Sequence, residues 1–138
     1  MNDLTFNIYV ISRYTHRYYA RELAKLGITM AQFPYIMAII RNDGISQEKL
    51  ASSLKVSKST TAAVIKQLVS AGLVKREVDR KDRRNFQLHA TPAAVKLNPQ
   101  IENAIDQCHQ ILTGNLSENE KAEFIKTLAK IRKEAETL

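Results

Sequence analysis

The chain of 138 residues has little of several residue types, with one cysteine, no tryptophan, three prolines and four glycines. The single cysteine, Cys108, excludes an intrachain disulfide and a cysteine-rich metal site. No stretch approaches the ~18 to 20 uncharged apolar residues that a membrane-spanning helix needs. Residues 1–10 lack the basic start of a secretory signal. We therefore expect a cytoplasmic protein of ordinary domain size with no membrane partner.

Positive charge dominates and is concentrated in the middle of the chain. Lysine and arginine total 21 against 14 acidic residues, a formal net charge of +7. Residues 55–84 hold nine basic and three acidic residues, whereas residues 101–138 hold five basic and seven acidic ones. A localised basic segment is typical of a polyanion-binding surface. Charge alone favours this interpretation no more than it favours a merely solvated basic face.

The hydrophobic periodicity is mostly helical and predicts six helices, which begin at about residues 4, 29, 46, 57, 92 and 117. Ser46, Ser57 and Ser117 are candidate N-caps, and Thr29 with Gln32 has the form of a capping box. Pro99 is expected to kink or interrupt the fifth helix. The first helix, at about 4–26, carries apolar side chains on two sides. A chain this short can easily cover only one of these two apolar sides. The second side therefore predicts a subunit interface.

Two segments instead have the period of strands, at residues 73–78 and 85–90. The second alternates cleanly, with Phe86, Leu88 and Ala90 on its inward side. Between the two segments, residues 79–84 are six consecutive charged residues with no apolar anchor. We predict a β-hairpin with a projecting, basic tip.

Residues 46–72 have the proportions of a helix-turn-helix, a short helix followed by a tight turn and a longer helix. The longer helix starts with short hydroxyl side chains that could reach DNA, although serine and threonine at a helix start are more often only caps. Its expected buried side consists of Val64, Ile65, Leu68 and Val69. The hairpin that follows fits the wing of a winged helix-turn-helix, in which a tip arginine can enter the minor groove. Asp79 and Asp82 would then hold an arginine within the chain.

Several segments of the chain resemble segments of the MarR family of regulators. Residues 72–84 are similar to its wing, which contains the pattern D-x-x-D-R-R, here Asp79 to Arg84. Leu50-Ala51 with residues 56–60 resembles its helix-turn-helix core, and residues 26–33 resemble the entry to its second helix. The resemblance covers nearly the whole chain in the right order. It implies a mainly α fold with a small β-hairpin wing, a winged helix-turn-helix flanked by N- and C-terminal dimerisation helices.

The resemblance also implies roles for individual residues. Arg84 would enter the minor groove, Asp82 would orient it, and Arg83 would contact phosphate. The residues expected to form the DNA-binding site are Ser57, Lys58, Ser59, Thr60, Thr61, Lys66, Arg80, Lys81, Asp82, Arg83 and Arg84. Residues 29–91 would form the DNA-binding domain, with residues 1–28 and 92–138 as the dimerisation helices.

We therefore expect a sequence-specific transcriptional regulator that binds double-stranded DNA as a homodimer on a pseudo-palindromic operator. The resemblance implies a repressor that responds to a small amphipathic or aromatic ligand; the alternative is a non-specific nucleoid-type DNA-binding protein. No catalytic motif, metal site or cofactor is expected, and Cys108 is expected to be a buried, inert thiol. Aromatic side chains could line a ligand pocket, but such a helical stripe is more often core; these are Tyr14, Tyr18, Phe33 and Tyr35.

Overall fold

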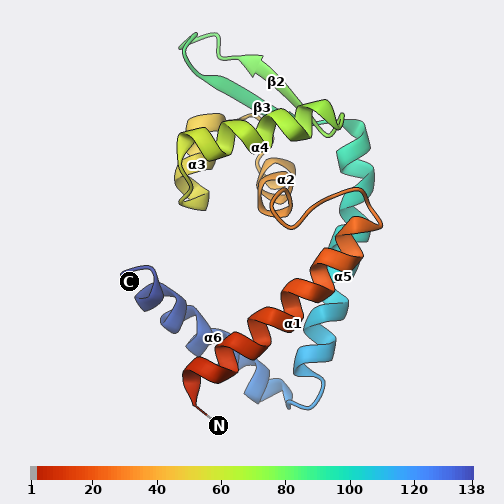
Figure 1. Cartoon of the computed structure of the whole chain (residues 1–138), viewed down its shortest axis with the longest axis vertical. Helices are drawn as coiled ribbons and strands as arrows, with labels where there is room; N and C mark the ends of the chain where they lie inside the picture. Colours follow the sequence, from red (N-terminus) through yellow and green to blue (C-terminus); the bar gives the residue numbers. More distant parts are fainter. Residues whose placement is uncertain (1–2) are drawn as a thin grey trace. The chain divides into compact units, whose positions relative to one another are not determined.

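The computed structural model describes residues 3–138 (Figure 1). Its elements in chain order are α1 (Leu4–Ala24), α2 (Phe33–Arg41), β1 (Ile45–Ser46), α3 (Gln47–Leu54), α4 (Lys58–Ser70), β2 (Val74–Val78), β3 (Phe86–Ala90), α5 (Pro92–Thr113) and α6 (Glu118–Ala135). The fold class is the predicted one, mainly helical with a β-hairpin. Pro99, which was expected to kink or interrupt the fifth helix, does not interrupt it, since α5 continues through that residue.

The sheet has one strand more than the sequence predicts. The two-residue strand β1 pairs antiparallel with β3, with Ile45 opposite Leu88, so that the order is β1-β3-β2. The hairpin register of β2 and β3 runs from Val74 opposite Ala90 to Val78 opposite Phe86. A strand of two residues has no periodicity of its own, and only the long-range pairing with β3 defines it.

The predicted helix caps form. The backbone N–H of Lys49 donates to Ser46 Oγ at 3.0 Å, and that of Thr60 donates to Ser57 Oγ at 3.1 Å. Thr29 and Gln32 make the reciprocal bonds of a capping box, yet α2 begins only at Phe33. Pro34 has no N–H to donate to the residue four positions earlier, which delays the regular helix.

By internal packing the chain divides into two compact units, one ending at Ala104 and one spanning Ile105–Leu138. This division describes packing within one chain, whereas the predicted dimerisation segments concern packing between two chains, so those boundaries stay predictions. The core of the first unit joins α2, α3, α4 and the sheet. Its fully buried large side chains include Leu23, Ile28, Ile36, Ile39, Leu50, Ile65, Leu68 and Leu88.

Two predictions about which side chains are buried need correction. In β3 only Leu88 is buried, while Phe86, which adjoins the hairpin tip, and Ala90, at the other end of the strand, are half-buried. Val69 of α4 is exposed rather than buried. The buried side of α4 instead follows the spacing Thr61, Val64, Ile65 and Leu68, which is one stripe of a helix.

Large apolar side chains lie exposed on two helices at the ends of the chain. In α1 only Leu23 is buried, and the apolar face includes Leu4, Ile8 and Ile11, each about half or more exposed. In α6 no residue is buried, and Phe124, Ile125, Leu128 and Ile131 are exposed. The hydroxyl of Tyr18 donates to the Ala104 carbonyl at 3.2 Å and ties α1 to the middle of α5. Among residues 3–138, no helix combines the length and apolar character needed to cross a membrane.

Candidate DNA-binding surface

The start of α4 carries a cluster of short hydroxyl side chains. Lys55 adopts a left-handed conformation, with φ of 55°, and ends α3 so that the chain can turn into α4. Ser57 Oγ caps α4, donates to Thr60 Oγ1 at 2.9 Å and lies 3.2 Å from Ser59 Oγ. Ser57, Ser59 and Thr60 are all exposed, as is Lys66 two turns further along α4. These residues lie on the outer surface of the helix, as expected.

Thr61 does not share that surface, and the prediction that it faces DNA is wrong in this structure. Its side chain is 0% exposed, and its Oγ1 has no hydrogen-bond partner. The physical reason is helical spacing, since Thr61 lies three, four and seven residues before Val64, Ile65 and Leu68 and therefore falls on their buried stripe. In the sequence, Thr61 belongs to a run of short polar residues at the helix start, so its place on the buried stripe was not recognised.

Lys58 lies at the first position of α4 and already has an anionic partner within the chain. Its Nζ is 3.0 Å from Glu48 Oε1, which belongs to the first turn of α3. Both side chains are exposed, so this ion pair contributes little to the stability of the fold. Sequence reasoning did not identify Glu48. The only signal was an acidic residue ten positions before Lys58, and that spacing identifies no contact.

The hairpin positions Arg84 by a two-point contact. Arg84 Nε is 3.1 Å from Asp82 Oδ1, and Nη2 is 3.3 Å from Oδ2, so the guanidinium meets the carboxylate as a fork. The Arg84 side-chain bonds, followed by its backbone N–H, lower the pKa of Asp82. The Arg84 side chain is nonetheless 91% exposed. The expectation that Asp82 holds an arginine is confirmed.

Asp79 has a different role from the one predicted. Its Oδ1 accepts the backbone N–H of Lys81 at 2.7 Å and that of Asp82 at 3.4 Å. Asp79 therefore shapes the turn rather than holding an arginine, because its short side chain reaches the backbone of the next residues first. Arg80, Lys81 and Arg83 are exposed at the tip that this turn creates.

One further cation of the hairpin was missed by the sequence analysis. The Arg76 guanidinium lies 4.4 Å from the centroid of the Phe86 ring, a cation–π contact that fixes its position. Arg76 is directly opposite Leu88 across the ladder, and Phe86 is the diagonal neighbour. Pairing register, which the sequence does not state, brings the two side chains together.

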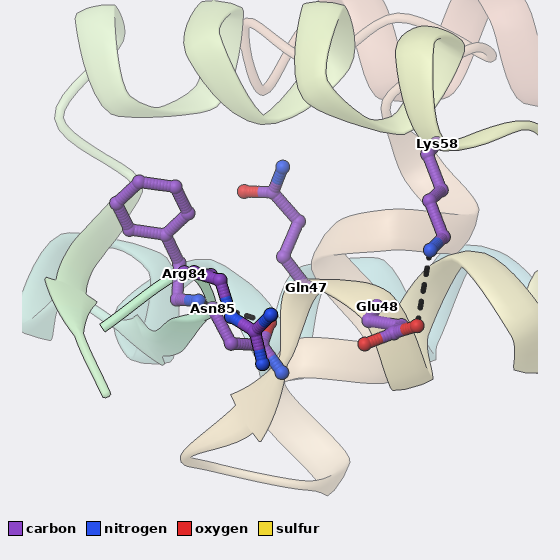
Figure 2. A pocket seen from close by; sticks show the side chains of 6 residues that line it. Gln47, Glu48, Lys58, Arg84 and Asn85 are labelled. Carbon is purple, nitrogen blue, oxygen red and sulfur yellow. Dashed lines mark hydrogen bonds and ion pairs between the residues drawn. The ribbon is translucent and has the colours of Figure 1, made fainter. Parts of the chain in front are cut away.

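Between α3, the start of α4 and the tip end of the wing lies a pocket (Figure 2). It is lined by Gln47 and Glu48 of α3, Lys58 of α4, and Arg84, Asn85 and Phe86 of the wing. The structure thus brings Lys58 and Arg84, from segments far apart in the sequence, to one surface. In Figure 1, β2 runs beside α4 and α3 lies at the start of α4.

Comparison with known proteins identifies the family. Residues 26–85 match the model of the MarR family. The chain is 31% identical to a MarR transcriptional regulator from Methanosarcina mazei Go1, with a TM-score of 0.88 over 97% of this chain and 96% of that one. The chain belongs to the MarR family.

Two other relatives extend the comparison. A putative transcriptional regulatory protein for the hcr operon of Thauera aromatica is 32% identical over 88% of this chain and 74% of its own length. A putative MarR family transcriptional regulator from Listeria monocytogenes, solved in complex with 26mer DNA, has a TM-score of 0.86 at 28% identity, over 97% of this chain and 89% of that one. This MarR-family chain is accordingly a DNA-binding transcriptional regulator and not an enzyme.

The remaining candidate residues of this MarR regulator do not line the pocket. Cys108 is buried and unpaired, as expected. Of the aromatic residues considered for a ligand pocket, Tyr35 is part of the core, Tyr14 is exposed, and Tyr18 and Phe33 are half-buried. Within residues 3–138, no three His, Cys, Asp or Glu side chains form a group that could hold a metal ion.

Proposed function

We propose that this MarR-family regulator is a cytoplasmic homodimer that binds a pseudo-palindromic operator and represses transcription from it. The observation that carries the proposal is the exposed guanidinium of Arg84, held in a fixed orientation by Asp82 on the same surface as the start of α4. A fixed, exposed arginine beside a recognition helix suits simultaneous contact with a minor and an adjacent major groove. A dimer that occupies an operator excludes polymerase from an overlapping promoter.

The proposed contacts follow from exposure and position. α4 would lie in the major groove, where Ser57, Ser59 and Thr60 reach base edges or phosphate and Lys66 contacts the backbone. The wing would lie along the minor groove, with Arg84 inserted and with Arg80, Lys81 and Arg83 near phosphates. Asp82 acts through Arg84 and does not touch DNA. Residues 29–91 would form the DNA-binding domain.

The homodimer rests on the exposed apolar faces of α1 and α6. Monomeric proteins rarely leave so many large apolar side chains in water on successive turns of one helix, and such a surface marks an interface. Residues 1–28 and 92–138 would therefore supply the contacts between the two copies. Ile8→Glu places a charge on the α1 face and should convert the dimer into monomer in sedimentation equilibrium. A wild-type chain that sediments as a monomer would contradict the assignment.

DNA binding is tested with a site selected from a random-sequence library and a scrambled duplex of equal length, both followed by fluorescence anisotropy. Arg84→Ala should weaken binding to the selected site by about tenfold or more, in the range of one lost specific contact. Arg41→Ala is a matched control, because Arg41 is an exposed arginine of α2 that pairs with Glu102 of α5 at 3.1 Å and takes no part in the pocket.

Unchanged affinity of Arg84→Ala would remove the minor-groove role. Equal affinity of the wild type for the selected and the scrambled duplex would favour a non-specific nucleoid-type protein instead. The proposed response to a small amphipathic or aromatic ligand follows from the family resemblance, and its test is release of the selected duplex when such a compound is added.

A further inference from the structure

The ion pair between Lys58 and Glu48 places a negative charge on the proposed DNA-binding surface. Figure 2 shows the Glu48 carboxylate directly below the Lys58 ammonium, at the edge of the pocket that also contains Arg84. Glu48 and Lys58 have exposed side chains, at 61% and 79%, so Lys58 can exchange the Glu48 carboxylate for a DNA phosphate. An acidic residue in that position repels the phosphates of DNA, so its presence there needs an explanation.

The position of the pocket suggests what passes over it. A major groove and the adjacent minor groove are separated by a single sugar–phosphate backbone. If α4 occupies one groove and Arg84 the other, as the proposed function requires, that backbone crosses the surface between them. This surface is the pocket, and Lys58 and Glu48 border it. Phosphate and the Glu48 carboxylate then compete for the same ammonium group.

The competition affects two kinds of complex differently. Binding to DNA of arbitrary sequence depends almost entirely on phosphate contacts, and there Lys58 would be recruited to the backbone. In a sequence-specific complex the first residues of the recognition helix contact base edges. Lysine there can donate to guanine O6 and N7. While the Lys58–Glu48 pair stays intact, Lys58 can therefore still contact a base edge. It cannot at the same time give its full charge to a backbone phosphate.

We infer that Glu48 is a specificity-determining residue, which withholds Lys58 from the DNA backbone and thereby suppresses binding to DNA of arbitrary sequence. This inference rests on the proposed function, because it needs α4 and the wing in adjacent grooves. Glu48 is acidic and lies outside the recognition helix, in α3. Neither its charge nor its position would by itself indicate a role in DNA recognition.

The test compares Glu48→Gln with wild type on the scrambled duplex and on the selected site. Glutamine keeps the size of the side chain and removes the charge. Lys58 should then gain a phosphate contact, so that the plot of log affinity against log salt on the scrambled duplex becomes steeper by about 0.9. At about 0.1 M salt this corresponds to binding that is roughly three to ten times tighter. Affinity for the selected site should change by less than about twofold, and the ratio of the two affinities should fall accordingly.

Two controls separate this role from a general charge effect. Glu102→Gln removes the same charge from the surface pair with Arg41, outside the pocket, and should leave both affinities unchanged. In a Lys58→Met background, Glu48→Gln should no longer steepen the salt dependence, because no ammonium group remains to gain a phosphate. A steeper slope in that background would show that the effect bypasses Lys58 and would overturn the inference.

The remaining outcomes are equally decisive. If Glu48→Gln binds the scrambled duplex no more tightly than wild type, or gains equally on both duplexes, Glu48 has no role in specificity while the proposed function stands. A wild-type protein that binds neither duplex would overturn both.

Discussion

Thr61→Val should make the protein more stable without changing its affinity for DNA. Thr61 lies in α4, is 0% exposed, and has an Oγ1 atom with no hydrogen-bond partner. Valine has nearly the same shape, with a methyl group in place of the hydroxyl. The substitution therefore removes a polar atom that is desolvated on folding, and it leaves the packing against Val64, Ile65 and Leu68 in place.

The expected gain follows from the cost of an unsatisfied buried group. Such a donor or acceptor destabilises the folded state by about 1–3 kcal/mol, and threonine and valine have similar helix propensities. The added methyl group contributes further apolar burial. We expect the free energy of unfolding to rise by about 1–2 kcal/mol, equivalent to a rise in Tm of roughly 3–8 °C for a chain of this size.

Urea unfolding followed by circular dichroism measures the gain, at one fixed protein concentration because dimerisation would otherwise shift the midpoint. Thr60→Val is the matched control, since the Thr60 hydroxyl is exposed and accepts a bond from Ser57 Oγ, so its removal should not stabilise the chain. A Thr61→Val variant that is less stable than wild type would refute the reasoning, because it would mean that the hydroxyl is satisfied in solution. A loss of DNA affinity in this variant would instead indicate that Thr61 contacts DNA.

Three other substitutions test separate features. Ser57→Ala should lower the free energy of unfolding by about 1 kcal/mol through loss of the α4 cap, measured by urea unfolding without DNA. The hydrogen bond from His89 lowers the pKa of Asp43 below its ordinary value of 3.8, so the stabilisation it gives is present above that value and is lost as the pH falls through the lowered pKa. Asp43→Asn should therefore destabilise the chain at pH 7 and lessen its loss of stability on acidification below about pH 5, and equal curves for both proteins would contradict this. Cys108 is 4% exposed, so peroxide should release DNA from neither wild type nor Cys108→Ser; a peroxide response lost in the variant would reverse this view.

Local signals in the sequence predicted those parts of the fold that local interactions determine. Ser46, Ser57 and Ser117 each cap the helix that follows them, because a cap involves only the next three residues. The hairpin was predicted for the same reason, since the six charged residues of its tip interrupt two segments of strand period. The pairing of Asp82 with Arg84, two residues apart, is again local.

The features that the sequence did not predict depend on distant contacts. β1 exists because β3 pairs with it from more than forty residues away. Glu48 meets Lys58 because α3 and α4 cross, and Arg76 meets Phe86 because the hairpin has one particular register. The prediction for Thr61 was wrong for a related reason. Its hydroxyl side chain suggested a contact with DNA, whereas its position on the helix assigns it to the core.

The short strand β1 also has a mechanical consequence. Ser46 pairs with Gln87 of β3, and α3 begins at the very next residue, with the Ser46 hydroxyl as its cap. No residue separates Ser46, which is paired with β3 of the wing, from the first helix of the helix-turn-helix. A force that bends the hairpin is therefore transmitted to the orientation of α3, so the wing and the first helix of the helix-turn-helix tilt together.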